Sequence, residues 1–368
     1  MVIYPVLRNS CYWFALLFIA CIGCHDTIDN PSGDLSYIPY HPVPYTVDIP
    51  QGFPALEQPG DNLMTVDGIQ LGRKLFYDPI FSVDSTVSCS SCHQQAKSFT
   101  DGLDRSNGVA GQTKRSSIDL INVGFTYHGL FWDGRASSLE QLALVPIEDP
   151  IEMANSWDTV EMRLKRHPNY PSDFRKAFGI ENISQIDRSL ATKAVAQFLR
   201  TIISGHNSKY DRFTRGEIFL EENEYNGYLM FFNIDPNLPD AQCGHCHNAP
   251  LMATNDFFNN GLQEASDLES IPDKGRGLIT GDPADNGKFK PPTLRNIALT
   301  APYMHDGRFK TLPEVLDHYA NGGKNSPNKS TFMFNLKLTE SEKSDIIAFL
   351  LTLTDSTTLT NPAYQNPF

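Results

Sequence analysis

The segments Cys89-Ser-Ser-Cys92-His93 and Cys243-Gly-His-Cys246-His247 decide how this chain of 368 residues is interpreted. Each follows the Cys-x-x-Cys-His pattern by which c-type haem is attached covalently. Two thiols on one tight turn can each form a thioether to a porphyrin vinyl group, and the adjacent imidazole then reaches the iron as its proximal ligand. We therefore predict two covalently bound c-type haems, with His93 and His247 as proximal ligands.

Paired cysteines also occur in redox dithiols and in Cys/His zinc sites. Neither alternative requires a histidine directly after the second cysteine, and this chain has one in both motifs. His245 lies between Cys243 and Cys246, where it should face away from the porphyrin. We expect no role for His245 as a ligand.

Length and charge restrict the classes of protein that remain. The chain is long enough for two domains, each with its own core. Its net charge of −13 argues against nucleic acid as a partner. An acidic surface could instead attract basic partners such as small electron-donor cytochromes, although a solvated acidic surface without any partner is the simpler explanation.

The N-terminus has the features of an export signal. Arg8 precedes an apolar run from Cys11 to Ile22, which is too short for a comfortable membrane span and long enough for a signal sequence. We predict a lipoprotein-type signal peptide over residues 1–24, with a lipid anchor at Cys24 or alternatively at Cys21. Processing at Cys24 leaves only the four haem cysteines as further thiols. The protein should then lie on the periplasmic side of a bacterial envelope.

A third match to the haem motif, Cys21-Ile-Gly-Cys24-His25, overlaps this signal. A third haem is therefore an alternative, but no helix that could belong to a haem domain precedes the motif. Residues 25–60 are rich in proline and lack apolar periodicity, which predicts an extended tether. We place an N-terminal haem domain at 61–210 and a C-terminal one at 211–368.

An internal repeat supports two haem domains. Gly72-Arg-Lys-Leu-Phe76 precedes the first motif by 17 residues, and Gly227-Tyr-Leu-Met-Phe231 precedes the second by 16. Downstream, Phe198-Leu-Arg-Thr-Ile202 and Phe349-Leu-Leu-Thr-Leu353 are similar as well. In both pairs, the second segment follows the first by about 150 residues.

The apolar spacing before these two downstream segments predicts amphipathic helices, with Ser184 and Thr339 as their N-caps. Each half thus has an opening helix, a haem-binding turn and a closing helix. Strand signals are few, and Gly, Pro and Asp are frequent between the helices. The predicted fold class is mainly α, with two tandem cytochrome-c-like haem domains and long irregular loops.

From about Asp61 to Asp355 the chain resembles one family, the bacterial dihaem cytochrome c peroxidases with their relatives of the MauG type. Besides the two haem motifs, the matching segments are Leu71-Gly-Arg-Lys-Leu-Phe76, Phe131-Trp-Asp-Gly-Arg135, Pro150-Ile-Glu-Met153, Pro292-Thr-Leu-Arg-Asn296 and Ala301-Pro-Tyr-Met-His-Asp-Gly307. So many matches in one order are not expected by chance.

The resemblance implies roles for individual residues. Peroxide would react at the haem of His93, and the haem of His247 would take in electrons. Trp132 matches the tryptophan between the two haems, with a core aromatic as the alternative. Glu152 matches the glutamate that moves a proton during cleavage of the O–O bond, although it could be a surface residue. Pro146 matches a proline that lines the same pocket.

Two departures from the peroxidase pattern concern the iron ligands. Many members carry a histidine in the loop that reads 98–115 here, where Val109 stands at about its position. The first haem should therefore be open as isolated, with His128 as a conceivable substitute ligand. At the second haem, the place of the usual distal methionine is taken by Tyr319, nineteen residues after Thr300. Met304 is the rival ligand.

The resemblance also implies a calcium ion between the domains, bound partly by the backbone carbonyls of Thr300 and Pro302. The family's Arg-Asn pair, which supplies a side-chain ligand, reads Arg115-Ser116 in this chain. Arg135 and Arg295 are predicted partners of haem propionates because a guanidinium fork suits a carboxylate, with surface arginines as the alternative.

We predict an enzyme, a cytochrome-c peroxidase that reduces hydrogen peroxide with electrons from a donor cytochrome or another small redox protein. One alternative is a MauG-like oxidase of a partner protein. Another is a dihaem electron-transfer cytochrome without peroxide chemistry. A homodimer is left open.

Overall fold

The computed structural model describes Met1, residues 33–127 and residues 129–368. The expectations for Cys21, Cys24, His25 and His128 lie outside the described residues. Residues 34–368 form one compact unit. No helix among the described residues is long and apolar enough to cross a membrane.

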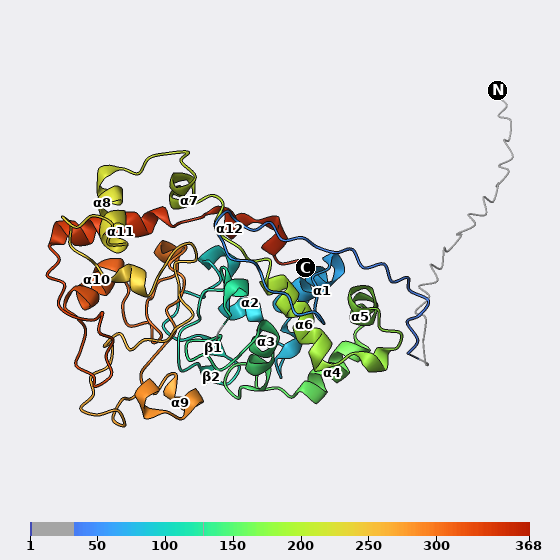
Figure 1. The fold of residues 1–368 in the computed structure, drawn as a ribbon. Coiled ribbons are helices and arrows are strands. Elements are labelled where there is room, and N and C mark those ends of the chain that lie inside the picture. The colour runs from blue at the N-terminus through green and yellow to red at the C-terminus, as the bar shows by residue number, and fades with distance from the viewer. Residues whose placement is uncertain (2–32, 128) are drawn as a thin grey trace. The chain divides into compact units, whose positions relative to one another are not determined.

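The compact unit is mainly helical with long irregular connections, as predicted (Figure 1). The described strands are a two-residue pair, β1 (Asn107–Gly108) and β2 (Gly111–Gln112). The α-helices are α1 (Val66–Tyr77), α2 (Cys89–Cys92), α3 (Leu139–Glu148), α4 (Trp157–Arg166), α5 (Tyr170–Phe178), α6 (Arg188–Leu199), α7 (Lys209–Thr214), α8 (Glu222–Phe231), α9 (Gly277–Thr280), α10 (Leu312–Ala320), α11 (Glu340–Thr352) and α12 (Thr357–Thr360).

A close helix crossing organises the first half. Helix α1 packs against α6, and Gly72 lies where the two backbones meet. A Cβ atom on Gly72 would stand 1.9 Å from the carbonyl oxygen of Ala194. Only a residue without a side chain permits this approach. Phe76 and Phe198 then pack edge to face, with ring centroids 5.2 Å apart.

The second half repeats this crossing with α8 and α11. A Cβ atom on Gly227 would stand 2.0 Å from the carbonyl oxygen of Asp345. The rings of Phe231 and Phe349 lie 5.1 Å apart. The repeated sequence segments therefore form the same helix crossing in each half. Figure 1 shows the pair α1 and α6 and the pair α8 and α11 in opposite parts of the compact unit.

The N-caps of the closing helices are partly as predicted. Thr339 caps α11, where its side chain accepts a hydrogen bond from the Glu342 backbone N–H. Ser184 was expected to cap α6, and this is wrong. Residues Ile183–Gln185 form a separate 3₁₀ turn, and α6 begins only after Asp187, whose side chain accepts from Leu190 N–H. A carboxylate directly before the helix is the better acceptor for its free N–H groups.

A second repeated unit leads into helices α3 and α10. Leu130 pairs with Ala136, and Tyr303 pairs with Phe309, as isolated antiparallel bridges. Each bridge closes a tight loop, and each loop leads into a capped helix, α3 after Ser138 and α10 after Thr311. The two units are 173 residues apart along the chain, a larger shift than that of the helix crossings.

This second repeat makes two pairs of residues equivalent. Trp132 and His305 hold the same place in the two loops. Pro146 and Tyr319 both stand eight residues after the N-cap of their helix. The duplication thus relates residues whose side chains have different chemistry.

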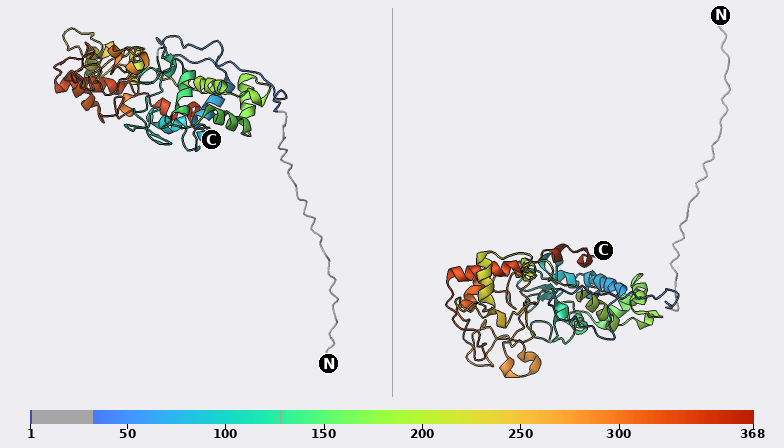
Figure 2. Two further views of the ribbon diagram at one scale, coloured as in Figure 1. Left: turned by 90° about the horizontal axis from the view of Figure 1, so that it is seen from below. Right: turned by 45° about the horizontal axis from the view of Figure 1, so that its top comes forward.

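Each half has its own hydrophobic core, one built on α1, α3 and α6 and the other on α8, α10 and α11. Tyr364, near the C-terminus, nevertheless belongs to the first core. The C-terminal segment lies against the first half, as Figure 2 shows, and Gln95 there donates to the carbonyl of Thr358 at 2.9 Å. The boundary at residue 210 remains a prediction, which the two separate cores support.

The described part of the predicted tether, residues 34–60, runs extended along the protein. Leu35 is buried in the first core, and its N–H donates to the carbonyl of Glu181 at 2.8 Å. Farther along, Phe53 packs edge to face on Phe125. From Asp34 onward this segment is therefore held to the folded unit by specific contacts.

Substituting either crossing glycine should destabilise the protein. We expect Gly72→Ala and Gly227→Ala each to lower the free energy of unfolding by ~1–3 kcal/mol, because the added methyl group must push two backbones apart. Gly60→Ala is the matched control, since nothing lies within 4 Å of a Cβ atom there. Thermal unfolding followed by circular dichroism measures the effect. Equal midpoints for all three variants would contradict the close crossing.

Candidate functional site

The two Cys-x-x-Cys-His motifs form tight turns of the same design. In the first, α2 comprises Cys89–Cys92, and the His93 N–H donates to the carbonyl of Cys89 at 3.0 Å. In the second, the His247 N–H donates to the carbonyl of Cys243 at 3.0 Å. All four cysteines are free of disulfides. Each turn therefore presents two thiols and an imidazole together, which thioether attachment requires.

The two histidine rings are oriented by backbone carbonyls. His93 Nδ1 lies 2.8 Å from the carbonyl oxygen of Phe99. His247 Nδ1 lies 3.2 Å from that of Met252 and 3.1 Å from that of Pro292. A carbonyl can only accept, so Nδ1 carries the proton and Nε2 keeps its lone pair for iron. Burial lowers the pKa of His247 to about 4, which favours the neutral ligand form.

A cavity of about 200 Å³, here called the larger cavity, opens beside the second motif. Cys243, Cys246 and His247 line it, together with apolar side chains from α10 and α11 such as Leu316 and Leu350. An apolar space with two thiols and an imidazole on its wall suits a porphyrin. The residues present therefore fit the predicted haem.

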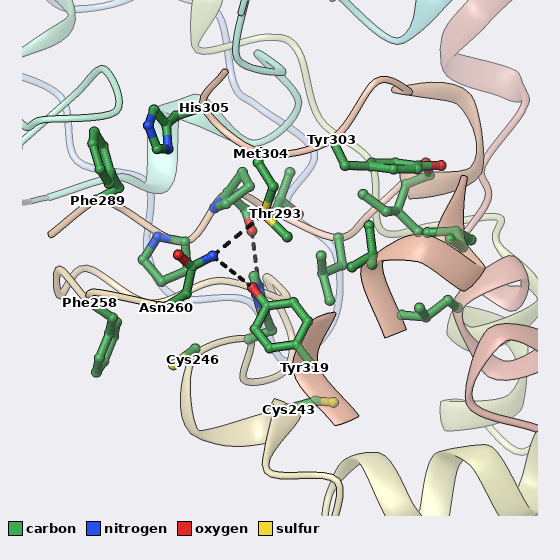
Figure 3. Close-up of a pocket in the computed structure, with 18 of the residues that line it drawn as sticks. Cys243, Cys246, Phe258, Asn260, Phe289, Thr293, Tyr303, Met304, His305 and Tyr319 are labelled. Atoms are coloured by element: carbon green, nitrogen blue, oxygen red, sulfur yellow. Dashed lines mark hydrogen bonds between the residues drawn. The ribbon is translucent and has the colours of Figure 1, made fainter. Parts of the chain in front are cut away.

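Both candidate distal ligands lie in the larger cavity, and one amide group contacts both (Figure 3). The Asn260 side-chain nitrogen lies 3.3 Å from Tyr319 Oη and 3.5 Å from Met304 Sδ. Burial raises the pKa of Tyr319 to about 12. No motif in the sequence marks Asn260. His318, next to Tyr319, contacts the carbonyl of Asn260 at 2.9 Å and holds that loop against α10.

Glu152 lies near the first motif. Burial raises the pKa of Cys89 and Cys92 to about 12 and about 11, and the charge of Glu152 contributes to both shifts, so the carboxylate is close to these thiols. Burial also raises the pKa of Glu152 itself, and repulsion from Asp149 adds to this, while Arg135 opposes it. A carboxyl group with a raised pKa suits proton transfer nearer neutral pH.

The loop that lacks a histidine supports the Glu152 segment. Val109 N–H donates to the carbonyl of Glu152 at 2.9 Å, and Ala110 N–H donates to that of Ile151 at 3.2 Å. Gly108 permits this contact, since a Cβ atom there would stand 2.0 Å from the Ile151 carbonyl oxygen. The backbone of this loop thus helps to fix the position of Glu152.

Trp132 lines the larger cavity although it belongs to the first half. Its indole N–H donates to the carbonyl of Ser116 at 2.9 Å. Its ring meets that of His305 edge to face, with centroids 6.4 Å apart. The two loop residues that the second repeat makes equivalent therefore touch each other. In the sequence, the similarity of Phe-Trp-Asp-Gly-Arg to Met-His-Asp-Gly-Arg is the signal that could have identified His305 as the counterpart of Trp132.

The predicted propionate partners have other contacts. Arg295 is 1% exposed, and its guanidinium donates to Asp211 at 2.9 Å and to the carbonyl of Pro250 at 2.8 Å. Arg135 lies over the ring of Phe131 at 3.6 Å from the centroid. Neither arginine lines the larger cavity.

The predicted calcium donors Thr300 and Pro302 lie on the wall of the larger cavity. The neighbouring loop contacts Ser116, whose Oγ donates to the carbonyl of Met304 at 2.9 Å and whose N–H donates to that of His305 at 2.9 Å. Among the described residues, no group of three or more His, Cys, Asp or Glu could hold a metal ion. A cation here would depend on carbonyl and hydroxyl oxygens.

Comparison with known proteins gives consistent results. The family model described as di-haem cytochrome c peroxidase matches residues 66–218. The methylamine utilization protein MauG of Methylorubrum extorquens is 36% identical over 303 residues, which cover 81% of each chain. The cytochrome c551 peroxidase of Nitrosomonas europaea is 34% identical, over 78% of this chain and 80% of that protein. A solved structure of a MauG-like protein associated with microbial copper homeostasis has a TM-score of 0.80 at 36% identity, covering 88% and 99% of the two chains.

The fold and the two attachment turns define a c-type dihaem protein. The chain belongs to the di-haem cytochrome c peroxidase family. The predicted family, the mainly helical fold and the two haems of the family are thereby confirmed. So is the predicted enzyme class, an oxidoreductase that acts on peroxide.

Proposed function

We propose that peroxide is reduced at the His93 haem and that electrons from a donor cytochrome or another small redox protein arrive through the His247 haem. The observation that carries this assignment is the difference between Pro146 and Tyr319 at equivalent places in the two halves. A haem supplies the iron that binds and reduces peroxide. Proline has no atom that can bind iron, whereas a phenol oxygen can. The first site therefore keeps a position for peroxide, and the second is closed.

Glu152 is proposed as the proton-transfer residue of the open site. Its raised pKa keeps a proton available, and the Val109 and Ala110 N–H groups hold its backbone segment in place. Its carboxyl group would accept a proton from one oxygen of the peroxide and return it to the other, which could then leave as water. Trp132, which touches residues of both halves, is proposed to couple the two haems.

Glu152→Gln should lower peroxide turnover by about 10²-fold or more, since the amide cannot exchange a proton. Glu148→Gln is the matched control, because Glu148 is exposed at the end of α3. Steady-state oxidation of a reduced cytochrome by peroxide gives the rate, and absorbance of the bound haem confirms equal loading. If both variants retain full activity, Glu152 does not transfer the proton.

Tyr319 is proposed as the distal ligand of the second haem, ahead of Met304. A phenol oxygen lowers the potential of the iron and supports higher oxidation states than a thioether does. Tyr319→Phe should change the electron paramagnetic resonance signal of that haem, and Met304→Leu should not. The reverse result would make Met304 the ligand.

An oxygen ligand at the second haem also suits a MauG-like oxidase of a partner protein, which is the second candidate. Mixing the ferric protein with peroxide and then with reduced cytochrome c separates the two. Rapid oxidation of the cytochrome supports the peroxidase. Oxidised protein that persists and does not react with cytochrome c supports the second candidate. No reaction in either step leaves a pure electron carrier.

A calcium ion between the halves is proposed as well, with the carbonyls of Thr300 and Pro302 among its ligands. Ca²⁺ prefers six to eight oxygen ligands, and Ser116 would offer a hydroxyl where relatives offer an amide. The proximity of Ser116 to the 300–305 loop supports this arrangement. Chelation should then lower the thermal midpoint, and an unchanged midpoint would remove the ion from the proposal.

We propose that the mature protein lies on the periplasmic side of a bacterial envelope, carries a lipid anchor at Cys24 or alternatively at Cys21, and pairs as a homodimer. The apolar run after Arg8 and the small residues before both cysteines support export and acylation. Mass spectrometry of the mature N-terminus tests this, because an unmodified end would exclude the anchor.

A further inference from the structure

Lys290 is a buried cation at the junction of the two halves. Lys290 is 7% exposed, and its backbone N–H donates to the carbonyl of Trp132 at 2.9 Å. Its ammonium group lies 3.3 Å from Asn255 Oδ1. A lysine is rarely buried to this extent unless a polar or charged environment receives it.

Lys290 lines two cavities at once. One is the larger cavity beside Cys243, Cys246 and His247. The other, here called the smaller cavity, has a volume of about 60 Å³ and is lined on one side by Phe131 and Leu142. Among the described residues, Lys290 is the one lysine or arginine on the wall of either cavity.

Residues on the wall of the smaller cavity belong to the surroundings of the first haem motif. The backbone of Ile118 interacts with the His93 ring. Phe131 and Leu142 pack against the same core as Cys89, whose thiol attaches that haem. Lys290 therefore lies on the wall of one cavity beside the second motif and of another that adjoins a residue in contact with His93.

Two buried polar atoms on the cavity walls make no hydrogen bond among the described residues. One is Thr254 Oγ1, on the wall of the smaller cavity. The other is His305 Nε2, on the wall of the larger cavity, which lies 3.8 Å from Asp273 Oδ2. Polar atoms buried in this way normally bind a partner, so both favour a polar ligand group in the cavities.

Each haem carries two propionate carboxylates, which require positive or hydrogen-bonding partners when they leave water. Arg295, which the sequence suggested, already donates to Asp211 and to the carbonyl of Pro250 and lines neither cavity. Arg135 lines neither cavity either. The position of Lys290 suits this role better.

We propose that Lys290 is a charge partner shared by the two haems, which meets a propionate of the second haem through the larger cavity and one of the first haem through the smaller cavity. Thr254 and His305 would donate hydrogen bonds to the same carboxylates. Burial lowers the pKa of Lys290 to about 8, opposed by Asp256, and a neighbouring carboxylate would raise it again. The inference rests on the two haem sites of the proposed function and not on the peroxide chemistry.

A shared cation affects both irons in the same direction. Reduction adds a negative charge to each haem, and a nearby ammonium group stabilises that charge. Removing the positive charge should therefore make both haems harder to reduce. A partner of one haem alone would shift only one of the two potentials.

Lys290→Gln tests this in an anaerobic redox titration of the holoprotein without peroxide. The high-spin and low-spin absorbance bands report the two haems separately. We expect the ratio of reduced to oxidised haem at a fixed potential to fall about tenfold for both, which is 59 mV for a one-electron couple. Lys288→Gln is the matched control, since Lys288 pairs with Asp285 and lines neither cavity. Its potentials should stay unchanged.

Asn255→Asp provides a second test if Lys290→Gln fails to bind haem. It keeps the lysine and places a carboxylate about where the amide oxygen now accepts from the ammonium group. Both potentials should again fall. A shift in only one haem, in neither haem, or equally in Lys288→Gln would overturn the proposal. Shifted potentials in a holoprotein that does not turn over peroxide would count against the proposed function instead.

Discussion

The close approach of two helix backbones is the constraint on which each half of this protein depends. At Gly72 and at Gly227 the opening helix meets the carbonyl of the closing helix with no room for a side chain. The two phenylalanine pairs then fill the space next to the crossing. The haem-binding turn follows the opening helix after a connection of eleven residues in each half, and its first cysteine packs against the core that the crossing organises.

Duplication gives the two halves a common frame on which equivalent positions carry different residues. The bridged loops and the helices that follow them correspond in the two halves, down to the N-caps Ser138 and Thr311. The residue eight positions later is Pro146 in one half and Tyr319 in the other. The ring of proline has no atom that can bind iron, whereas the phenol oxygen of tyrosine can. In the proposed function, this one substitution on a common frame gives the two haem sites their different roles.

Much of the fold could be predicted because its signals are local. The attachment motifs, the apolar spacing of the helices and the capping threonine at Thr339 each depend on residues close together in the chain. Ser184 was misjudged as a cap because a short 3₁₀ turn competes there, and Asp187 stands nearer the helix. Asn260 and His305 were missed for another reason. No motif marks Asn260, and the similarity of the His305 segment to that of Trp132 does not show that either residue reaches the wall of a cavity that α10 and α11 complete.

The sequence by itself determined that this protein attaches two haems, that its halves are repeats and that it belongs among the dihaem peroxidases. These properties rest on covalent chemistry and short-range spacing, which the order of residues contains. Only the tertiary structure decided that Asn260 contacts both Tyr319 and Met304, that Trp132 touches His305, and that Lys290 lies between two cavities. Such contacts join residues far apart in the chain, and their distances follow from how whole helices pack rather than from any local pattern.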